Sequence, residues 1–122
     1  MKSKLLLVDD SALARRSLRT ILESDGFEVV EAEDGMAALE RYFLEKPDLV
    51  LLDLVMKGMY GLDVLTKLRQ LDPSARVVVV TADVQDSSHQ LVQEAGASGF
   101  INKPIDKHRV LEVIRGVLEE SA

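Results

Sequence analysis

Short runs of apolar residues alternate along this chain with segments in which apolar residues recur at helical spacing. The five runs are nearly continuous in apolar residues, which is typical of strands buried on both faces of a sheet. They span Lys4–Val8, Phe27–Glu31, Asp48–Leu52, Arg76–Val80 and Gly99–Ile101. The fourth run is the clearest strand, because its consecutive valines suit a pleated surface and disfavour a helix.

The segments between and after these runs predict five amphipathic helices. Their apolar stripes contain, in chain order, Ala14, Leu18, Ile21 and Leu22; Leu39, Tyr42 and Phe43; Leu62, Leu65 and Leu68; Ser88, Leu91, Val92 and Ala95; and Val110, Val113, Ile114 and Val117. Gly26, Pro47, Pro73 and Gly96 lie where the first four helices are expected to end. The fourth helix has the thinnest apolar face, which favours a movable element.

The alternation of strands and helices predicts an α/β fold with a parallel sheet covered by helices on both faces. The length of 122 residues fits one domain, and we expect residues 1–122 to form it. Ligands of such sheets bind at the carboxyl ends of the strands, near the point where the strand order reverses. The residues that follow the strands are therefore the candidates for function.

Composition excludes several classes of function. The net charge of −6 disfavours direct binding to nucleic acid or to an anionic membrane, since both need a surplus of Lys and Arg. The chain has no cysteine, which excludes disulfides and thiolate metal sites. Every apolar run is too short to span a bilayer, and the N-terminus lacks the longer apolar stretch of a signal peptide. We therefore expect a cytoplasmic protein.

Acidic and polar side chains lie at the ends of four of the five predicted strands. Asp9 and Asp10 come after the first strand, Asp53 ends the third, Thr81 follows the fourth and Lys103 follows the fifth. If these four strands are neighbours, the five side chains meet at one edge of the sheet. A like-charged pair about 4 Å apart costs about 4 kcal/mol at an effective dielectric constant of about 20, so the three carboxylates need compensation, either by raised pKa values or by a cation.

These residue types together favour phosphoryl-transfer chemistry. Lys103 supplies one positive charge, and a hard divalent cation would supply two more. All-oxygen ligands, with no cysteine and no suitably placed histidine, favour Mg²⁺ over Zn²⁺. A hydroxyl, a fixed ammonium, a dication and a carboxylate nucleophile are the groups that phosphoryl transfer requires. The carboxylate can itself accept the phosphoryl group as an aspartyl phosphate.

The same residues also have structural interpretations. Asp9 and Asp10 could cap the first helix, where an acid contributes about 0.3–1 kcal/mol. Thr81 could be an ordinary strand-end hydroxyl, and Lys103 could be a solvated loop lysine. Their occurrence together at one predicted sheet edge favours the metal site over these separate roles.

Four segments carry a resemblance to a known family. LLLVDD (5–10), LVLLDLVMKGMYG (49–61), VVVVTA (77–82) and GFINKP (99–104) resemble, in this order and spacing, the motifs of bacterial response-regulator receiver domains. The resemblance covers the whole chain. It implies a flavodoxin-like, doubly wound sheet of five parallel strands with five helices, in the strand order 2-1-3-4-5 known for chemotaxis members of the family.

The resemblance implies a role for each residue of the candidate site. Asp53 would be the phosphoacceptor. Mg²⁺ would be bound by Asp10, Asp53 and the backbone carbonyl of Val55, with Asp9 contributing directly or through waters. Lys103 would pair with the phosphoryl oxygens.

The resemblance also implies a conformational switch. Thr81 would be pulled toward the phosphoryl group, and Phe100 would swing into the space that Thr81 leaves. The Lys103–Pro104 peptide bond is expected to be cis, since rare cis bonds usually precede proline. The chain departs from the family pattern at Lys57, where proline is usual, at Phe100, where many relatives have tyrosine, and at Ile105, where an aromatic is frequent.

The partners implied by the resemblance are proteins. A sensor histidine kinase or a phosphotransfer protein would donate the phosphoryl group, and a downstream target protein would receive the signal. The chain would catalyse only its own phosphorylation and dephosphorylation. Phosphorylation would bias a two-state equilibrium at the fourth helix, fifth strand and fifth helix. We expect a monomer or a weak, phosphorylation-dependent dimer.

Three other functions fit the sequence less well. Phosphatases and phosphotransferases that use an aspartyl phosphate usually carry a second acid two residues past the nucleophile, where this chain has Val55. A flavin or dinucleotide binder would need a Gly-rich loop after the first strand, where residues 9–11 would repel phosphate. A receiver kept only as a docking module is disfavoured by the intact set of Asp, Thr and Lys side chains.

Overall fold

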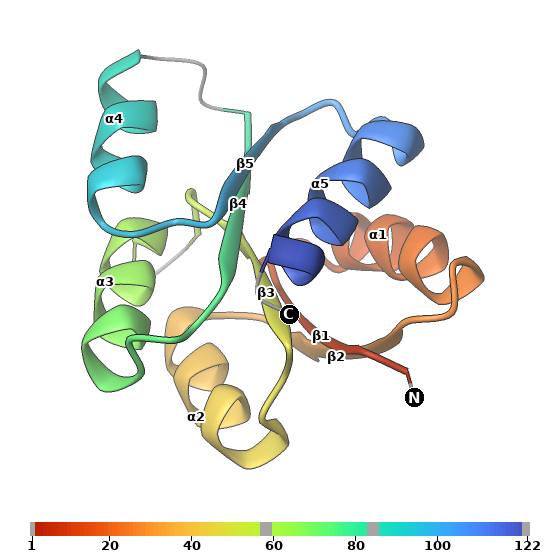
Figure 1. Cartoon of the computed structure of the whole chain (residues 1–122), viewed down its shortest axis with the longest axis horizontal. Coiled ribbons are helices and arrows are strands. Elements are labelled where there is room, and N and C mark those ends of the chain that lie inside the picture. Colours follow the sequence, from red (N-terminus) through yellow and green to blue (C-terminus); the bar gives the residue numbers. More distant parts are fainter. Residues whose placement is uncertain (1, 57–59, 83–85, 121–122) are drawn as a thin grey trace.

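The computed structural model describes residues 2–56, 60–82 and 86–120. It contains a five-stranded parallel sheet in the order β2-β1-β3-β4-β5 (Figure 1). The strands are β1 (Lys4–Val8), β2 (Glu28–Ala32), β3 (Leu49–Asp53), β4 (Val77–Thr81) and β5 (Gly99–Asn102). The helices are α1 (Ala12–Ser24), α2 (Gly35–Glu45), α3 (Gly61–Leu71), α4 (Asp86–Glu94) and α5 (Lys107–Glu120). The expected fold class and strand order are therefore confirmed.

Two separate apolar cores lie on the two faces of the sheet. Alternate residues of the strands enter opposite cores, so that Leu5 and Leu7 pack on one side and Leu6 and Val8 on the other. Helices α1 and α5 cover the first face, and α2, α3 and α4 cover the second (Figure 1). Burial on both faces explains why the strands are nearly continuous in apolar residues.

Three strands begin and end one residue later than the apolar pattern predicts. β3 includes Asp53, which pairs with Val80, and β4 includes Thr81, which pairs with Asn102. Backbone pairing in a parallel ladder depends on the main chain, so it continues past the last apolar side chain. As a result, these two polar side chains are held by the sheet itself.

Two residues of the predicted apolar stripes are exposed, so their expected burial is wrong. Phe43 is 49% exposed, and its ring is nearly perpendicular to the buried Tyr42 ring, with 5.5 Å between the ring centroids. Leu91 is 51% exposed, whereas its neighbour Val92 is buried. Adjacent residues lie about 100° apart around a helix, so a narrow contact buries only one of each pair. The side chain of Ser88, in the same stripe as Leu91, lies outside the described part of the chain.

The chain reverses direction close to the predicted helix ends. Gly26 and Gly96 have φ angles of +90° and +96°, which glycine adopts at little cost. Pro47 and Pro73 each come two residues after the last residue of a helix.

Among the described helices, none is long and apolar enough to cross a membrane.

A hydrogen bond joins α2 to the end of α3. The Tyr42 hydroxyl donates to Oδ2 of Asp72 over 2.6 Å. Burial and the neighbouring Asp72 carboxylate raise the pKa of Tyr42, so its hydroxyl remains a donor at neutral pH. The same hydrogen bond, with others from Ser74, lowers the pKa of Asp72 below its ordinary value.

We predict that Tyr42→Phe lowers the free energy of unfolding by about 1 kcal/mol at neutral pH, because the variant loses this hydrogen bond. Since folding lowers the pKa of Asp72, the bond stabilises the protein above the ordinary carboxyl pKa of about 3.9. The stabilisation is lost as the pH falls through the lower pKa of folded Asp72. Urea unfolding of both proteins from neutral to acid pH measures the difference, and a constant difference would contradict the prediction.

Candidate functional site

Three carboxylates meet at the carboxyl edge of the sheet, where the sequence predicts them. Asp9 and Asp10 follow β1, and Asp53 is the last residue of the neighbouring strand β3. One carboxylate oxygen from each lies within 4.8 Å of the others. Asp9 and Asp53 are buried, with exposed fractions of 2% and 7%, and Asp10 is exposed. The arrangement is a half-buried acidic cluster that is open to solvent on one side.

The turn that carries Asp9 is held on several sides. The Asp9 N–H donates to the Ala32 carbonyl of β2 over 3.2 Å, and Oδ1 of Asp9 accepts from the Ser11 N–H over 2.9 Å. Ser11 is the N-cap of α1, and its hydroxyl accepts from the Ala14 N–H over 3.2 Å. The other carboxylate oxygen of Asp9, Oδ2, contacts Nζ of Lys103.

Lys103 connects two of the three carboxylates. Its Nζ lies 3.2 Å from Oδ2 of Asp9 and 3.3 Å from Oδ2 of Asp53. The Lys103 N–H donates to the Thr81 carbonyl over 2.8 Å, and the following peptide bond to Pro104 is cis, as expected. Lys103 is therefore part of the site and not a solvated loop lysine.

The pKa values of Asp53 and Lys103 reflect competition between burial and neighbouring charges. Burial raises the pKa of Asp53 above its ordinary value, and the Asp9 charge adds to the rise. The Val55 N–H, which donates to Oδ1 of Asp53 over 3.1 Å, and the Lys103 ammonium oppose it. Burial lowers the pKa of Lys103, but the carboxylates of Asp53 and Asp9 outweigh burial and raise it, so Lys103 is charged at neutral pH.

Thr81 and Phe100 share one face of the sheet. Phe100 pairs with Val79, which lies two residues before Thr81, so their side chains point to the side covered by α4. Thr81 is fully buried and Phe100 is partly buried. The ring centroids of Phe100 and of His89 on α4 are 4.2 Å apart. His89 is exposed, and its ring contact with Phe100 is not evident in the sequence.

The acidic cluster fits a hard divalent cation. The side-chain donors of the cluster are carboxylate oxygens, which suit Mg²⁺ better than Zn²⁺. Val55, whose carbonyl the resemblance to receiver domains adds to the expected ligands, has an exposed side chain, and its N–H donates to Asp53. Lys57 lies outside the described residues.

Two residues contact the backbone of the site but are not singled out by the sequence alone. A Cβ added to Gly61 would lie 2.4 Å from the backbone oxygen of Asp53 and 2.5 Å from Cα of Leu54. A glycine at a helix start with no capping side chain is the weak signal of this close approach. The other is Arg15. Its guanidinium donates to the Asp9 carbonyl over 2.6 Å.

Comparison with known proteins places the site in context. Residues 5–115 match the family model of the response regulator receiver domain. The chain is 42% identical over 119 residues to the chemotaxis protein CheY of Bacillus subtilis (strain 168), covering 97% of this chain and 99% of that protein. It is similar to a CheY-like receiver domain protein from Methanospirillum hungatei JF-1, with a TM-score of 0.93, 30% identity and coverage of 98% and 96% of the two chains.

A second solved structure is similar and carries bound groups. It is a complex of CheX, CheY, BeF3 and Mg²⁺ from Borrelia burgdorferi. Its TM-score with this chain is 0.91 at 32% identity, covering 94% of this chain and 88% of that one. An acidic cluster of the kind seen at Asp9, Asp10 and Asp53 is typical of a metal site in such proteins.

We predict that Gly61→Ala lowers the free energy of unfolding by about 1–3 kcal/mol, because the new methyl group would meet backbone atoms of Asp53 and Leu54 that cannot easily move. The backbone amide NMR signals of both residues should shift. Gly116→Ala in α5 is the matched control, since a Cβ there has nothing within 4 Å. The control should raise stability by up to about 1 kcal/mol. Equal stability of Gly61→Ala and wild type would contradict the prediction.

Proposed function

Since this chain belongs to the response regulator receiver domain family, we propose that Asp53 is the side chain that accepts its phosphoryl group. The chain is phosphorylated in two-component signalling, and it is a signalling switch and not a true enzyme. One observation carries the assignment. Asp53 ends β3, the central strand of the sheet, where its carboxylate lies beside those of Asp9 and Asp10 and contacts the Lys103 ammonium.

We infer that the dication of this site is Mg²⁺. The carboxylates of Asp9, Asp10 and Asp53 and the backbone carbonyl of Val55 would hold it. When bound, the ion neutralises the negative charge of the carboxylates and of the phosphoryl oxygens. The presence of Mg²⁺ in the similar complex from Borrelia burgdorferi supports this choice.

The residues of this chain have distinct roles in the proposed transfer. An oxygen of Asp53 forms a bond to phosphorus while the bond between phosphorus and the donor histidine nitrogen breaks. The electron pair of the broken bond stays on the nitrogen. The Val55 N–H holds Oδ1 of Asp53 in place, and the charged Lys103 neutralises charge on the transferred oxygens. The histidine would belong to a sensor kinase or a phosphotransfer protein.

We propose that Thr81 and Phe100 transmit the signal. Their position on one face of the sheet supports a movement in which Thr81 turns toward the phosphoryl group and Phe100 fills the space that it leaves. Phe100 contacts His89, so such a movement would change the surface formed by α4 and β5. A downstream target protein would read that surface. CheX is bound to the CheY of the similar complex, which supports a protein partner.

Several finer expectations remain proposals. We propose that residues 1–122 form one receiver domain, of which the family model covers 5–115. We also propose a monomer or a weak, phosphorylation-dependent dimer with no direct contact to nucleic acid or to a membrane, since the net charge is −6.

We predict that the protein gains one phosphoryl group when it is incubated with acetyl phosphate and Mg²⁺. Intact mass measurement detects the gain. It should disappear when Mg²⁺ is removed, because the three carboxylates then repel the incoming anion. It should also disappear in Asp53→Asn.

Asp63→Asn is the matched control for this experiment. Asp63 is exposed in the first turn of α3, so the control changes the net charge equally without altering the acidic cluster. The control should be phosphorylated like wild type. A gain of mass in Asp53→Asn equal to that of wild type would show that another residue is the acceptor.

A further inference from the structure

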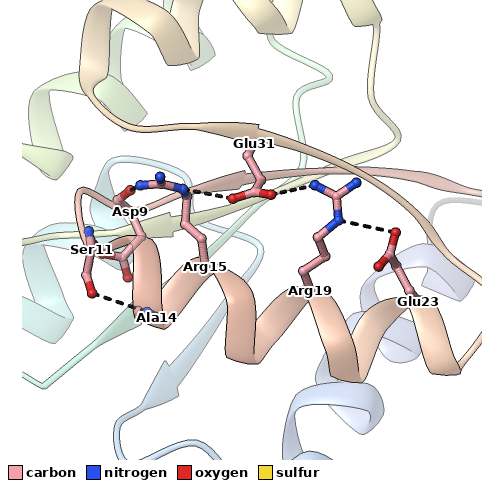
Figure 2. Close-up of polar contacts among 7 residues, drawn as sticks. All are labelled: Asp9, Ser11, Ala14, Arg15, Arg19, Glu23 and Glu31. Carbon is pink, nitrogen blue, oxygen red and sulfur yellow. Dashed lines mark hydrogen bonds and ion pairs between the residues drawn. The ribbon is translucent and has the colours of Figure 1, made fainter.

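Arg15 links α1 to the backbone of the acidic cluster. Figure 2 shows its guanidinium between the Asp9 carbonyl and the Glu31 carboxylate. The first contact is 2.6 Å long, from Nη1 to the carbonyl oxygen, and the second is 2.8 Å, from Nε to Oε1. The Arg15 side chain is only 15% exposed. Both ends of the planar guanidinium are therefore engaged in a largely buried position.

The position of the Asp9 carbonyl affects the acidic cluster directly. It belongs to the peptide plane between Asp9 and Asp10, so its direction determines where the main chain of Asp10 begins. The other polar groups of Asp9 are engaged by Ala32, Ser11 and Lys103. The Arg15 guanidinium therefore restrains the peptide that connects a buried acid of the cluster to an exposed one.

Glu31 holds Arg15 in turn. Its second carboxylate oxygen accepts from Arg19, and Nε of Arg19 lies 3.2 Å from Glu23 (Figure 2). Burial raises the pKa of Glu31, but the hydrogen bonds from Arg19 and Arg15 outweigh burial and lower it, so Glu31 is charged at neutral pH. The four side chains form a continuous row along α1 and the end of β2.

We infer that Arg15 is a positioning residue for Mg²⁺ binding. It fixes the peptide between Asp9 and Asp10 so that the Asp10 carboxylate stays close to Asp53, and Glu31 and Arg19 keep its guanidinium in place. This inference rests on the proposed magnesium site. Residues that orient metal ligands from outside typically contribute about 10–100-fold to metal affinity.

Charge and positioning predict opposite results for the removal of Arg15. Arg15 is a cation close to a cation site, so by charge alone its removal should strengthen Mg²⁺ binding. If Arg15 acts by positioning, its removal should weaken Mg²⁺ binding. A loss of stability alone would leave the affinity of the folded protein unchanged.

The experiment titrates Mg²⁺ into wild type, Arg15→Met, Arg15→Lys and Arg16→Met, and follows the backbone amide NMR signals of the folded protein. Arg15→Met keeps the length and apolar stem of the side chain. Arg15→Lys keeps the charge but lacks the planar fork that contacts two oxygens in fixed directions. Arg16 is exposed on the same helix, so Arg16→Met is the matched control for net charge. Urea unfolding without Mg²⁺ reports the stability of each variant.

We expect the Mg²⁺ dissociation constant of Arg15→Met and of Arg15→Lys to rise about tenfold. Arg16→Met should stay within about twofold of wild type, since an exposed charge is largely screened by salt. If Arg15→Met fails to fold, Arg15→Lys alone decides the outcome. Unchanged or tighter binding by the folded Arg15 variants would overturn the inference while leaving the proposed function intact. Failure of wild type to bind Mg²⁺ would overturn both.

Discussion

Three mutually repelling carboxylates, two of them buried, meet at one edge of the sheet, and their burial there is the constraint on which the rest of the structure depends. Asp9 and Asp53 are buried, and burial raises the pKa of Asp53 above its ordinary value. The single ammonium of Lys103 contacts both but leaves an excess of negative charge in the cluster. A site arranged in this way favours a dication and, with it, the anion of a phosphoryl group.

The surrounding fold keeps the carboxylates close in spite of this repulsion. Parallel pairing of β1 and β3 brings the two chain segments together, and apolar cores on both faces of the sheet resist their separation. Gly61 lets the start of α3 approach the backbone of Asp53. Ser11 and Arg15 hold the turn after β1 from the side of α1. Function therefore depends on contacts that no single motif contains.

The sequence predicts the strands well because burial on both faces leaves a continuous apolar signal. It predicts the site because the carboxyl ends of parallel strands meet at one edge. The strand order comes from the resemblance, since apolar runs do not say which strands are neighbours. The exposure of Phe43 and Leu91 depends on the width of the contact between each helix and the sheet. The contacts of Arg15 and Gly61 depend on distances between elements, which side-chain periodicity does not encode.

The most direct test of the central claim is the free energy of unfolding of wild type and Asp53→Asn, each with and without Mg²⁺. Because folding raises the pKa of Asp53, its ionised form opposes folding, and the neutral variant should be more stable than wild type without Mg²⁺. Addition of Mg²⁺ should stabilise wild type more than the variant. A variant less stable than wild type without Mg²⁺ would contradict the claim that the buried charge of Asp53 in this acidic cluster opposes folding.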